Sequence, residues 1–273
     1  MYTWSIAHAT ALQLSPVHLL ETAASLGVPE VGIRLEQLTD NEPHFELIGN
    51  PANISRVQRV MQSTGVSIRD TEVVRLTPGF EIDAYRGFLE TTAELGARSV
   101  TVQTPDPNRG RAKEHLRRFA EAAAQYNLRC ELEFVSWTEV PDLHTAADIV
   151  TAVDMSNVGI LVDVLHFVRS ASSYEELRSL PPEWFAMAHL NDGPSLAPTG
   201  VERLVHAARH NRCIPFSGDF HIADILACLP EDITLTVEVP NDSALDELGA
   251  EQYVKRVMTR SQSGLKTILE GAS

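Results

Sequence analysis

The sequence predicts an α/β fold, a single (β/α)8 TIM barrel that takes in residues 1–273. Strand-like and helix-like segments alternate from one end of the chain to the other, and no low-complexity linker divides them. The length of 273 residues is about what one such barrel needs, and a hydrophobic content of 44% is ample for one large core. We therefore expect one domain.

The first half of the chain contains the first four strand–helix units and a fifth strand. The first strand is residues 4–7. The first helix begins at Ser15-Pro16, because a capping hydroxyl and a proline at the first helical position favour a helix start, and it runs to Gly27. Further helices are expected at 55–65, 85–96 and 115–127, each ending near Gly or Asn. The strands that go with them are expected at 31–35, 66–74, 99–103 and 128–134.

The second half repeats this alternation. Helices are expected at 143–153, 174–180, 222–229 and 250–269, and strands at 158–164, 185–190 and 233–239. The total is eight strands and eight helices. The strands are apolar on both faces, as parallel strands must be when helices cover one face and the other fills a barrel interior.

Four of these strands end in side chains that bind divalent cations. Glu133, Asp163, His189 and Glu238 are separated by 30, 26 and 49 residues, each long enough for one strand–helix unit, the last with an insertion. They therefore recur at the carboxyl ends of successive strands, where such barrels carry their functional groups. Three carboxylates and an imidazole suit one divalent metal ion, Mn²⁺, Mg²⁺, Co²⁺ or Zn²⁺. The alternative for each residue alone is a polar strand end that pairs with an arginine.

The charge balance favours a small-molecule partner. The chain has 22 Lys and Arg against 37 Asp and Glu, and its net charge of −15 repels nucleic acids and anionic membranes. No stretch approaches the roughly 18 apolar residues that span a bilayer, and the first residues do not resemble a signal peptide. We expect a cytoplasmic protein with no nucleic-acid or membrane partner; the oligomeric state stays open, a homo-oligomer included. Cys130, Cys213 and Cys228 lack CxxC spacing, which predicts reduced thiols.

Nearly the whole chain resembles the xylose-isomerase-like TIM-barrel superfamily, a group of sugar phosphate isomerases and epimerases. The likeness is carried by ELEF with Glu133, VDVLH with Asp163 and His166, HLND with His189, the segment RCIPFSGDF, and VEVP with Glu238. The resemblance implies that Glu133, Asp163, His189 and Glu238 bind the metal and that His166 faces the substrate. Such barrels host isomerases, epimerases, dehydratases and a DNA-repair endonuclease, so the likeness alone does not select an activity.

A metal site of this kind suits reactions that begin with proton removal beside a carbonyl. A divalent ion that chelates vicinal carbonyl and hydroxyl oxygens stabilises the enediolate, while a carboxylate takes the proton. By resemblance to ketose 3-epimerases, Glu133 and Glu238 are expected on opposite sides of the reacting carbon, each as ligand and acid/base. In a dehydratase the enolate expels a β-hydroxyl, and His166 is the candidate proton donor to the departing water.

Three functions are therefore expected, in order of preference. The first is a divalent-metal-dependent isomerase or epimerase of a small polyhydroxylated ketone or sugar. The second is a metal-dependent dehydratase, a lyase, of a cyclic hydroxyketone such as 3-dehydroshikimate or a keto-inositol. The third is a barrel that binds a small molecule without turnover. The net charge and the lack of further histidine ligands disfavour a DNA-repair endonuclease.

Four more side chains are candidates for contact with the substrate: Arg212, Arg169, Glu72 and Trp137. Arg212 precedes the IPFSGDF turn, where dehydratase-type relatives place an arginine, whereas the arginine that ketose 3-epimerases carry soon after the strand-seven histidine is absent. Each candidate has a structural alternative. Arg169 could instead form an ion pair with Glu175 or Glu176. Glu72 could pair with Arg75, and Trp137 could pack under its loop.

Further candidates are found at other strand ends and in the long last connection. His8 and Glu36, which end the first two strands, are candidates for the pocket wall. Arg203 and Arg209 lie in ERLVHAARHNR, which is also typical of a solvated helical face. Ser217-Gly218-Asp219 replaces the Gly-Glu-Gly-like turn of relatives, which loosens the link to any one subfamily.

Overall fold

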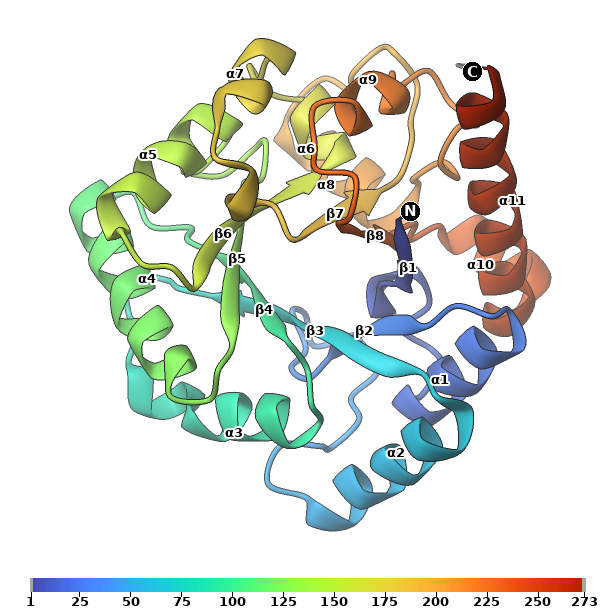
Figure 1. Cartoon of the computed structure of the whole chain (residues 1–273), viewed down its shortest axis with the longest axis horizontal. Coiled ribbons are helices and arrows are strands. Elements are labelled where there is room, and N and C mark those ends of the chain that lie inside the picture. Colours follow the sequence, from blue (N-terminus) through green and yellow to red (C-terminus); the bar gives the residue numbers. More distant parts are fainter. Residues whose placement is uncertain (1, 272–273) are drawn as a thin grey trace.

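In residues 2–271, the part of the chain that this computed structural model describes, eight parallel strands close a barrel (Figure 1). The strands follow one another around the barrel in chain order, and the first pairs with the last. This confirms the predicted fold class. The strands are β1 (Thr3–Ile6), β2 (Glu30–Arg34), β3 (Ser67–Arg75), β4 (Ser99–Gln103), β5 (Arg129–Glu133), β6 (Val158–Asp163), β7 (Met187–Leu190) and β8 (Thr234–Val237).

Helices surround the barrel as an outer ring (Figure 1). They are α1 (Pro16–Ser25), α2 (Pro51–Thr64), α3 (Arg86–Glu94), α4 (Arg109–Ala124), α5 (Leu143–Val153), α6 (Val164–Val168), α7 (Tyr174–Ser179), α8 (Val201–His210), α9 (Ile222–Leu226), α10 (Asp242–Leu248) and α11 (Ala250–Gly271). Short 3-10 turns are η1 (His8–Thr10), η2 (Ile82–Tyr85) and η3 (Pro182–Trp184).

Capping residues fix where several helices begin and end. The Ser15 hydroxyl accepts a hydrogen bond from the His18 backbone N–H at 3.3 Å, and Pro16 is the first helical residue, as the sequence predicts. Gly65 ends α2 with a φ of 75°, a left-handed conformation that glycine adopts without a steric penalty. These caps hold the helices at defined lengths, so each following strand begins at a fixed place.

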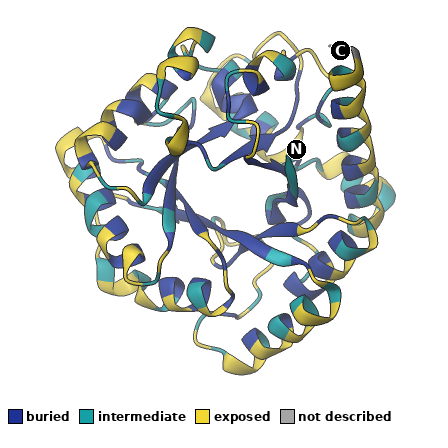
Figure 2. Ribbon diagram, in the orientation of Figure 1, coloured by how far each residue is buried: buried dark blue, intermediate teal, exposed yellow. Residues whose placement is uncertain are grey.

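The barrel strands are buried and the helices are buried on their inward side only (Figure 2). Every residue of β6 is buried, for example. Phe88 of α3 and Phe119 of α4 belong to the same hydrophobic cluster as the strand residues. This packing makes the strands a stiff frame, and the side chains at their carboxyl ends are held in place by it.

The later connections are more elaborate than one helix per strand. Both α6 and α7 lie between β6 and β7, and both α8 and α9 lie between β7 and β8, which accounts for the insertion expected there. An additional helix, α10, precedes α11. None of the helices within residues 2–271 is long and apolar enough to cross a membrane. All three cysteines are free, and burial raises the pKa of the Cys130 thiol.

Candidate metal and substrate site

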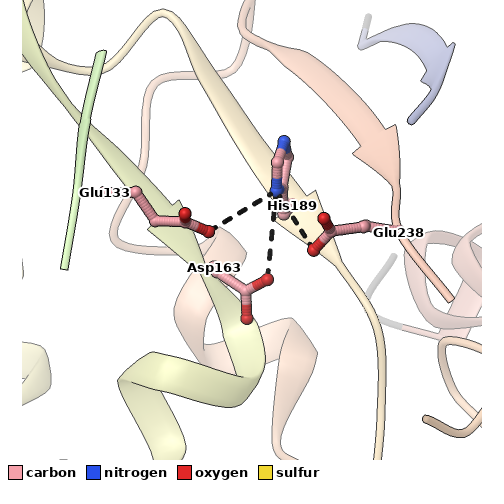
Figure 3. Close-up of side chains that lie close together, drawn as sticks. All are labelled: Glu133, Asp163, His189 and Glu238. Carbon is pink, nitrogen blue, oxygen red and sulfur yellow. Dashed lines mark ion pairs between the residues drawn. The ribbon is translucent and has the colours of Figure 1, made fainter. Parts of the chain in front are cut away.

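Four side chains meet at the carboxyl end of the barrel. Glu133 ends β5, Asp163 ends β6, His189 lies in β7 and Glu238 directly follows β8. One ligand atom from each lies within 4.8 Å of the other three, and Figure 3 shows the three carboxylates turned toward one imidazole. The four strand-end residues that the sequence singles out are therefore brought together. Their role as metal ligands remains a prediction.

His189 is at the centre of this cluster. Its Nδ1 lies 3.4 Å from Glu238 Oε2 and 3.9 Å from both Glu133 Oε1 and Asp163 Oδ2. The ring is buried, and among the described residues neither ring nitrogen has a hydrogen-bond partner. A buried imidazole that makes no hydrogen bond is costly, and a cation bound between the ring and the three carboxylates would relieve that cost.

Arg212 is the basic member of the site. Its guanidinium nitrogen Nη1 lies 2.7 Å from Asp163 Oδ2 and 2.7 Å from Glu238 Oε2, the same two oxygens that face His189. Arg212 is buried, and its Nε donates to the Ala208 carbonyl at 2.7 Å. Arg212 was predicted from the sequence to contact the substrate. The structure places it on the cavity wall as an ion-pair partner of the carboxylates.

The crowded charges separate the pKa values of the site. Burial, together with the negative charge of Glu238, raises the pKa of Glu133 to about 7. Burial also opposes ionisation of Glu238, but Arg212 and His189 outweigh it and hold the pKa of Glu238 well below its usual range. Burial disfavours a charged His189, yet the surrounding carboxylates raise its pKa to about 10. One glutamate is thus ionised while the other titrates near neutral pH.

These residues fit a divalent cation. Three carboxylates and one guanidinium leave two uncompensated negative charges, which one divalent ion neutralises. Carboxylate oxygens with one imidazole nitrogen are the donor set that Mn²⁺, Mg²⁺, Co²⁺ and Zn²⁺ accept. One ring nitrogen of His189, which makes no hydrogen bond among the described residues, would supply the remaining ligand. Without an ion the site takes up protons instead, which is what the raised pKa values of Glu133 and His189 express.

His166 is held at the site by the same carboxylate that faces Arg212. Asp163 is the N-cap of α6, and its Oδ1 accepts a hydrogen bond from the His166 backbone N–H at 3.1 Å. The His166 ring packs edge-on against Trp137 at a centroid distance of 4.9 Å, and both side chains line the cavity. Burial lowers the pKa of His166 to about 4, so its ring is neutral at pH 7.

Two residues that sequence reasoning missed complete the site. Gln103, the last residue of β4, donates from Nε2 to Glu133 Oε2 at 2.6 Å and so orients that carboxylate. Arg34, the last residue of β2, forms ion pairs with Glu72 at 3.2 Å and with Glu42 at 2.8 Å. Both stand at strand ends, which is the signal that could have identified them.

The suggested ion pair of Glu72 with Arg75 is wrong, because Glu72 pairs with Arg34.

A cavity of about 440 Å³ opens beside the cluster, which is the size of a site for a small molecule. It is lined by Glu133, His189 and Glu238 of the cluster and by four of the predicted contact residues, Glu72, Trp137, His166 and Arg212. Glu72 is buried there, and its Oε1 accepts a hydrogen bond from the His8 backbone N–H at 2.8 Å. Of the other candidates, Arg209 also lines the cavity, whereas Arg169, His8, Glu36 and Arg203 are not in its lining among the described residues.

Arg169 is a correction to the sequence-based prediction. Its guanidinium donates to the carbonyls of Pro194 and Ser195 and lies over the Phe220 ring, 4.8 Å from the centroid. The described part of the chain therefore places Arg169 under the loop after β7, outside the cavity lining, and not in an ion pair with Glu175 or Glu176. A cation–π contact and two carbonyl acceptors satisfy it there.

His8 and Glu36 are also not in the cavity lining of the described residues. His8 Nε2 donates to the Leu14 carbonyl at 2.8 Å, and Nδ1 accepts from the Arg34 backbone N–H at 3.0 Å. Both ring nitrogens are therefore engaged in holding β2 and the first loop. Glu36 is exposed on the loop after β2.

The turn at Ser217-Gly218-Asp219 has a structural role. Buried Asp192 accepts backbone hydrogen bonds from Gly218 at 2.9 Å and from Phe220 at 3.0 Å. A Cβ at Gly218 would lie 2.5 Å from Asp192 Oδ1, so only glycine allows this approach. Asp192 thus anchors the turn to the end of β7.

Comparison with known proteins identifies one family and relatives with two activities. A family model described as xylose isomerase-like TIM barrel matches residues 76–260. A 3-dehydroshikimate dehydratase of Pseudomonas aeruginosa is 32% identical over 115 residues, which are 42% of this chain and 18% of that protein. An inosose isomerase of Bacillus licheniformis is 29% identical over 122 residues, 41% of this chain and 44% of that protein. The similarity thus spans less than half the length of either relative.

Solved structures agree on the fold. A crystal structure of the IolI protein with a bound zinc atom superposes with a TM-score of 0.74, covering 98% of this chain and 97% of that chain. The sequence identity is 20%, so this likeness shows the architecture only.

Proposed function

Since this chain belongs to the xylose isomerase-like TIM barrel family, we propose that it is a divalent-metal-dependent isomerase or epimerase of a small polyhydroxylated ketone or sugar. The observation that carries the proposal is the cluster of Glu133, Asp163, His189 and Glu238, whose ligand atoms lie within 4.8 Å of one another beside a cavity. These four residues hold the metal. When bound, a divalent ion there supplies Lewis-acid polarisation of a carbonyl and its neighbouring hydroxyl.

The two glutamates act as the proton acceptor and the proton donor. Glu238 is ionised, because Arg212 and His189 keep its pKa low, and it removes the proton beside the substrate carbonyl. Glu133, on the other side of His189, is the candidate for returning a proton to the enediolate, and the Gln103 amide holds its carboxylate in place. The two carboxylates come from β5 and from the end of β8, on either side of His189 (Figure 3).

Other side chains position the reacting groups. Gln103 fixes the Glu133 carboxylate with a 2.6 Å hydrogen bond, so that the proton moves at a defined oxygen. Trp137 and His166 form an apolar and a polar part of one cavity wall, against which the carbon skeleton of the substrate packs. Arg212 keeps Glu238 ionised and neutralises charge that develops on the substrate oxygens.

A dehydratase is the second candidate, and the 32% identity with a 3-dehydroshikimate dehydratase favours it. The same proton removal would be followed by loss of a β-hydroxyl, with His166 as the proton donor to the departing water. The neutral imidazole of His166, with a pKa of about 4, is a poor donor at pH 7. For this reason we place the isomerase first.

Solvent exchange separates these candidates. Metal-loaded protein is incubated in D₂O with ketohexoses, keto-inositols, ketohexose phosphates and 3-dehydroshikimate, and the products are weighed by mass spectrometry. An isomerase or epimerase gives a product one mass unit heavier, because solvent deuterium replaces the removed proton. A dehydratase gives a product lighter by one water. If no substrate shows either mass change, the result contradicts the proposal and favours a barrel that binds a small molecule without turnover.

A further inference from the structure

Two arginines face the cavity without an acidic partner. Arg75 ends β3 and Arg209 lies in the last turn of α8, and both line the cavity beside Glu133 and Glu238. Throughout residues 2–271 neither guanidinium has a hydrogen-bond or ion-pair partner, and the Nε of Arg75 is buried. A buried guanidinium nitrogen without a partner is uncommon, so the Nε of Arg75 calls for an explanation, and the exposed Arg209 lines the same cavity.

Glu42, the acidic group that acts on Arg209, is already engaged. Glu42 is close enough to Arg209 to influence it, but its carboxylate pairs with Arg34 at 2.8 Å and accepts the Leu38 backbone N–H at 3.1 Å. Arg209 is exposed at the rim of the cavity, and desolvation there lowers its pKa, as do the positive charges of Arg75 and Arg34. Arg34 is compensated by two glutamates, whereas Arg75 and Arg209 add uncompensated positive charge to a protein with a net charge of −15.

This positive charge lies within one small molecule's length of the cluster. Arg75 is the register partner of Gln103 across β3 and β4, and Gln103 contacts Glu133 on the next strand. Neighbouring strands are about 4.8 Å apart, so the backbone of Arg75 is on the order of 10 Å from that of Glu133. A ring or chain of about six carbons with its reacting end at Glu133 therefore presents its other end to Arg75.

We propose that Arg75 and Arg209 bind an anionic substituent, a carboxylate or a phosphate, on the substrate whose hydroxyketone end lies against Glu133 and Glu238. The forked guanidinium matches the oxygens of either group, and both arginines remain charged at any working pH. The inference rests on the proposed function and narrows its substrate class. It favours anionic hydroxyketones over neutral ketoses and neutral keto-inositols.

The first test compares substrates on metal-loaded protein. The variants are Arg75→Ala, Arg209→Ala and the double variant, with Arg203→Ala, an exposed residue of α8, as the matched control. For 3-dehydroshikimate or a ketohexose phosphate, each single variant should raise KM by roughly 10- to 100-fold, the loss expected for hydrogen bonds to a charged group, with kcat little changed. A raised KM for 3-dehydroshikimate would identify the anion as a carboxylate, and a raised KM for the ketohexose phosphate would identify it as a phosphate. Arg203→Ala should behave as the wild type.

Equal kcat/KM of wild type and double variant for every accepted substrate would overturn the inference while leaving the proposed function intact. If Arg75→Ala does not fold by circular dichroism, Arg75→Gln, which keeps a polar side chain, replaces it.

The second test does not depend on turnover. Isothermal titration calorimetry with inorganic phosphate and with malonate should show binding of at least one anion to the wild type and to Arg203→Ala, and at least tenfold weaker binding to Arg75→Ala/Arg209→Ala. Such binding without turnover of any substrate would support the anion site and contradict the proposed function. Equal binding, or none, in wild type and double variant would overturn the inference.

Discussion

The two ends of the barrel both bury charged side chains, but they compensate them differently. At the amino end, buried Arg69 donates to the Ser99 hydroxyl at 2.9 Å and to the Thr234 hydroxyl at 3.3 Å. Nearby, Arg129 and Glu131 form an ion pair of 3.0 Å. Both arginines thus have acceptors within the protein, neutral hydroxyls for Arg69 and a carboxylate for Arg129, although the second oxygen of Glu131, Oε2, has no hydrogen-bond partner among the described residues.

At the carboxyl end the match is incomplete. One guanidinium pairs with two of the three carboxylates, and within residues 2–271 neither nitrogen of His189 makes a hydrogen bond. We infer from this difference that the amino end serves stability, whereas the carboxyl end is the candidate site for a cation and a substrate. Matched substitutions at the two ends test this distinction.

The largest expected effect concerns Glu238. The variant Glu238→Gln keeps the shape of the side chain but cannot accept a proton, so turnover should fall by roughly 10²–10⁴-fold. Steady-state kinetics on metal-loaded, folded protein measures it. Glu131→Gln, the matching change of a buried strand glutamate at the amino end, should retain turnover. Near wild-type turnover by Glu238→Gln would show that the base is elsewhere.

Arg212→Met should destabilise the metal-free protein by about 3–5 kcal/mol, because it leaves Asp163 and Glu238 buried without their counter-ion. Saturating Mn²⁺ should restore much of this loss, since the ion neutralises the same carboxylates. Thermal unfolding with and without Mn²⁺ measures both effects. A loss of stability that Mn²⁺ leaves untouched would argue that Arg212 and the ion do not share these oxygens.

Arg69→Met is the counterpart at the amino end and should have a smaller effect. It removes hydrogen bonds from a buried charged group, which costs about 1–3 kcal/mol. Mn²⁺ should stabilise this variant by the same amount as it stabilises the wild type, and turnover should be unchanged. If Arg69→Met abolished Mn²⁺ binding, the two ends could not be regarded as independent.

The stability of the metal-free protein should depend on pH in a defined direction. The pKa values of Glu133, about 7, and of His189, about 10, lie above their ordinary values of 4.5 and 6.5. The folded protein thus holds protons that the unfolded chain has lost, and stability falls as pH rises through these windows, by up to about 1.4 kcal/mol per pH unit for each proton. Mg²⁺ replaces these protons and should therefore stabilise more strongly at pH 8.5 than at pH 6.

Thermal unfolding at pH 6 and pH 8.5, with and without Mg²⁺, measures this dependence, and Glu133→Gln should flatten the slope between pH 5 and 7. A metal-free protein that is more stable at pH 8.5 than at pH 6 would contradict the assigned pKa directions.

The sequence was sufficient for the barrel and for the cluster, because strand ends are set by local patterns. The alternation of apolar strands and capped helices gives the order of the strands, and parallel strands place Glu133, Asp163 and His189 at one edge. The helix start at Ser15 follows from its own side chain in the same way. These features depend on neighbours close in the chain.

The side chains on connecting segments were less predictable, because their directions depend on contacts far apart in sequence. Arg169 turns to the carbonyls of Pro194 and Ser195, and this requires the path of the loop after β7. Arg34 pairs with Glu72, 38 residues away, through packing that no local pattern records. Arginine reaches so far that its partner cannot be read from its position alone.

The most direct test of the central claim is the metal content of the protein. Equilibrium dialysis against Mn²⁺, followed by elemental analysis, should give one ion per chain for the wild type and for Arg69→Met. Asp163→Asn/His189→Ala removes two of the four ligands at the carboxyl end and should give essentially none, with the fold retained by circular dichroism. One ion per chain retained by the folded double variant would contradict the assignment of this cluster as the metal site.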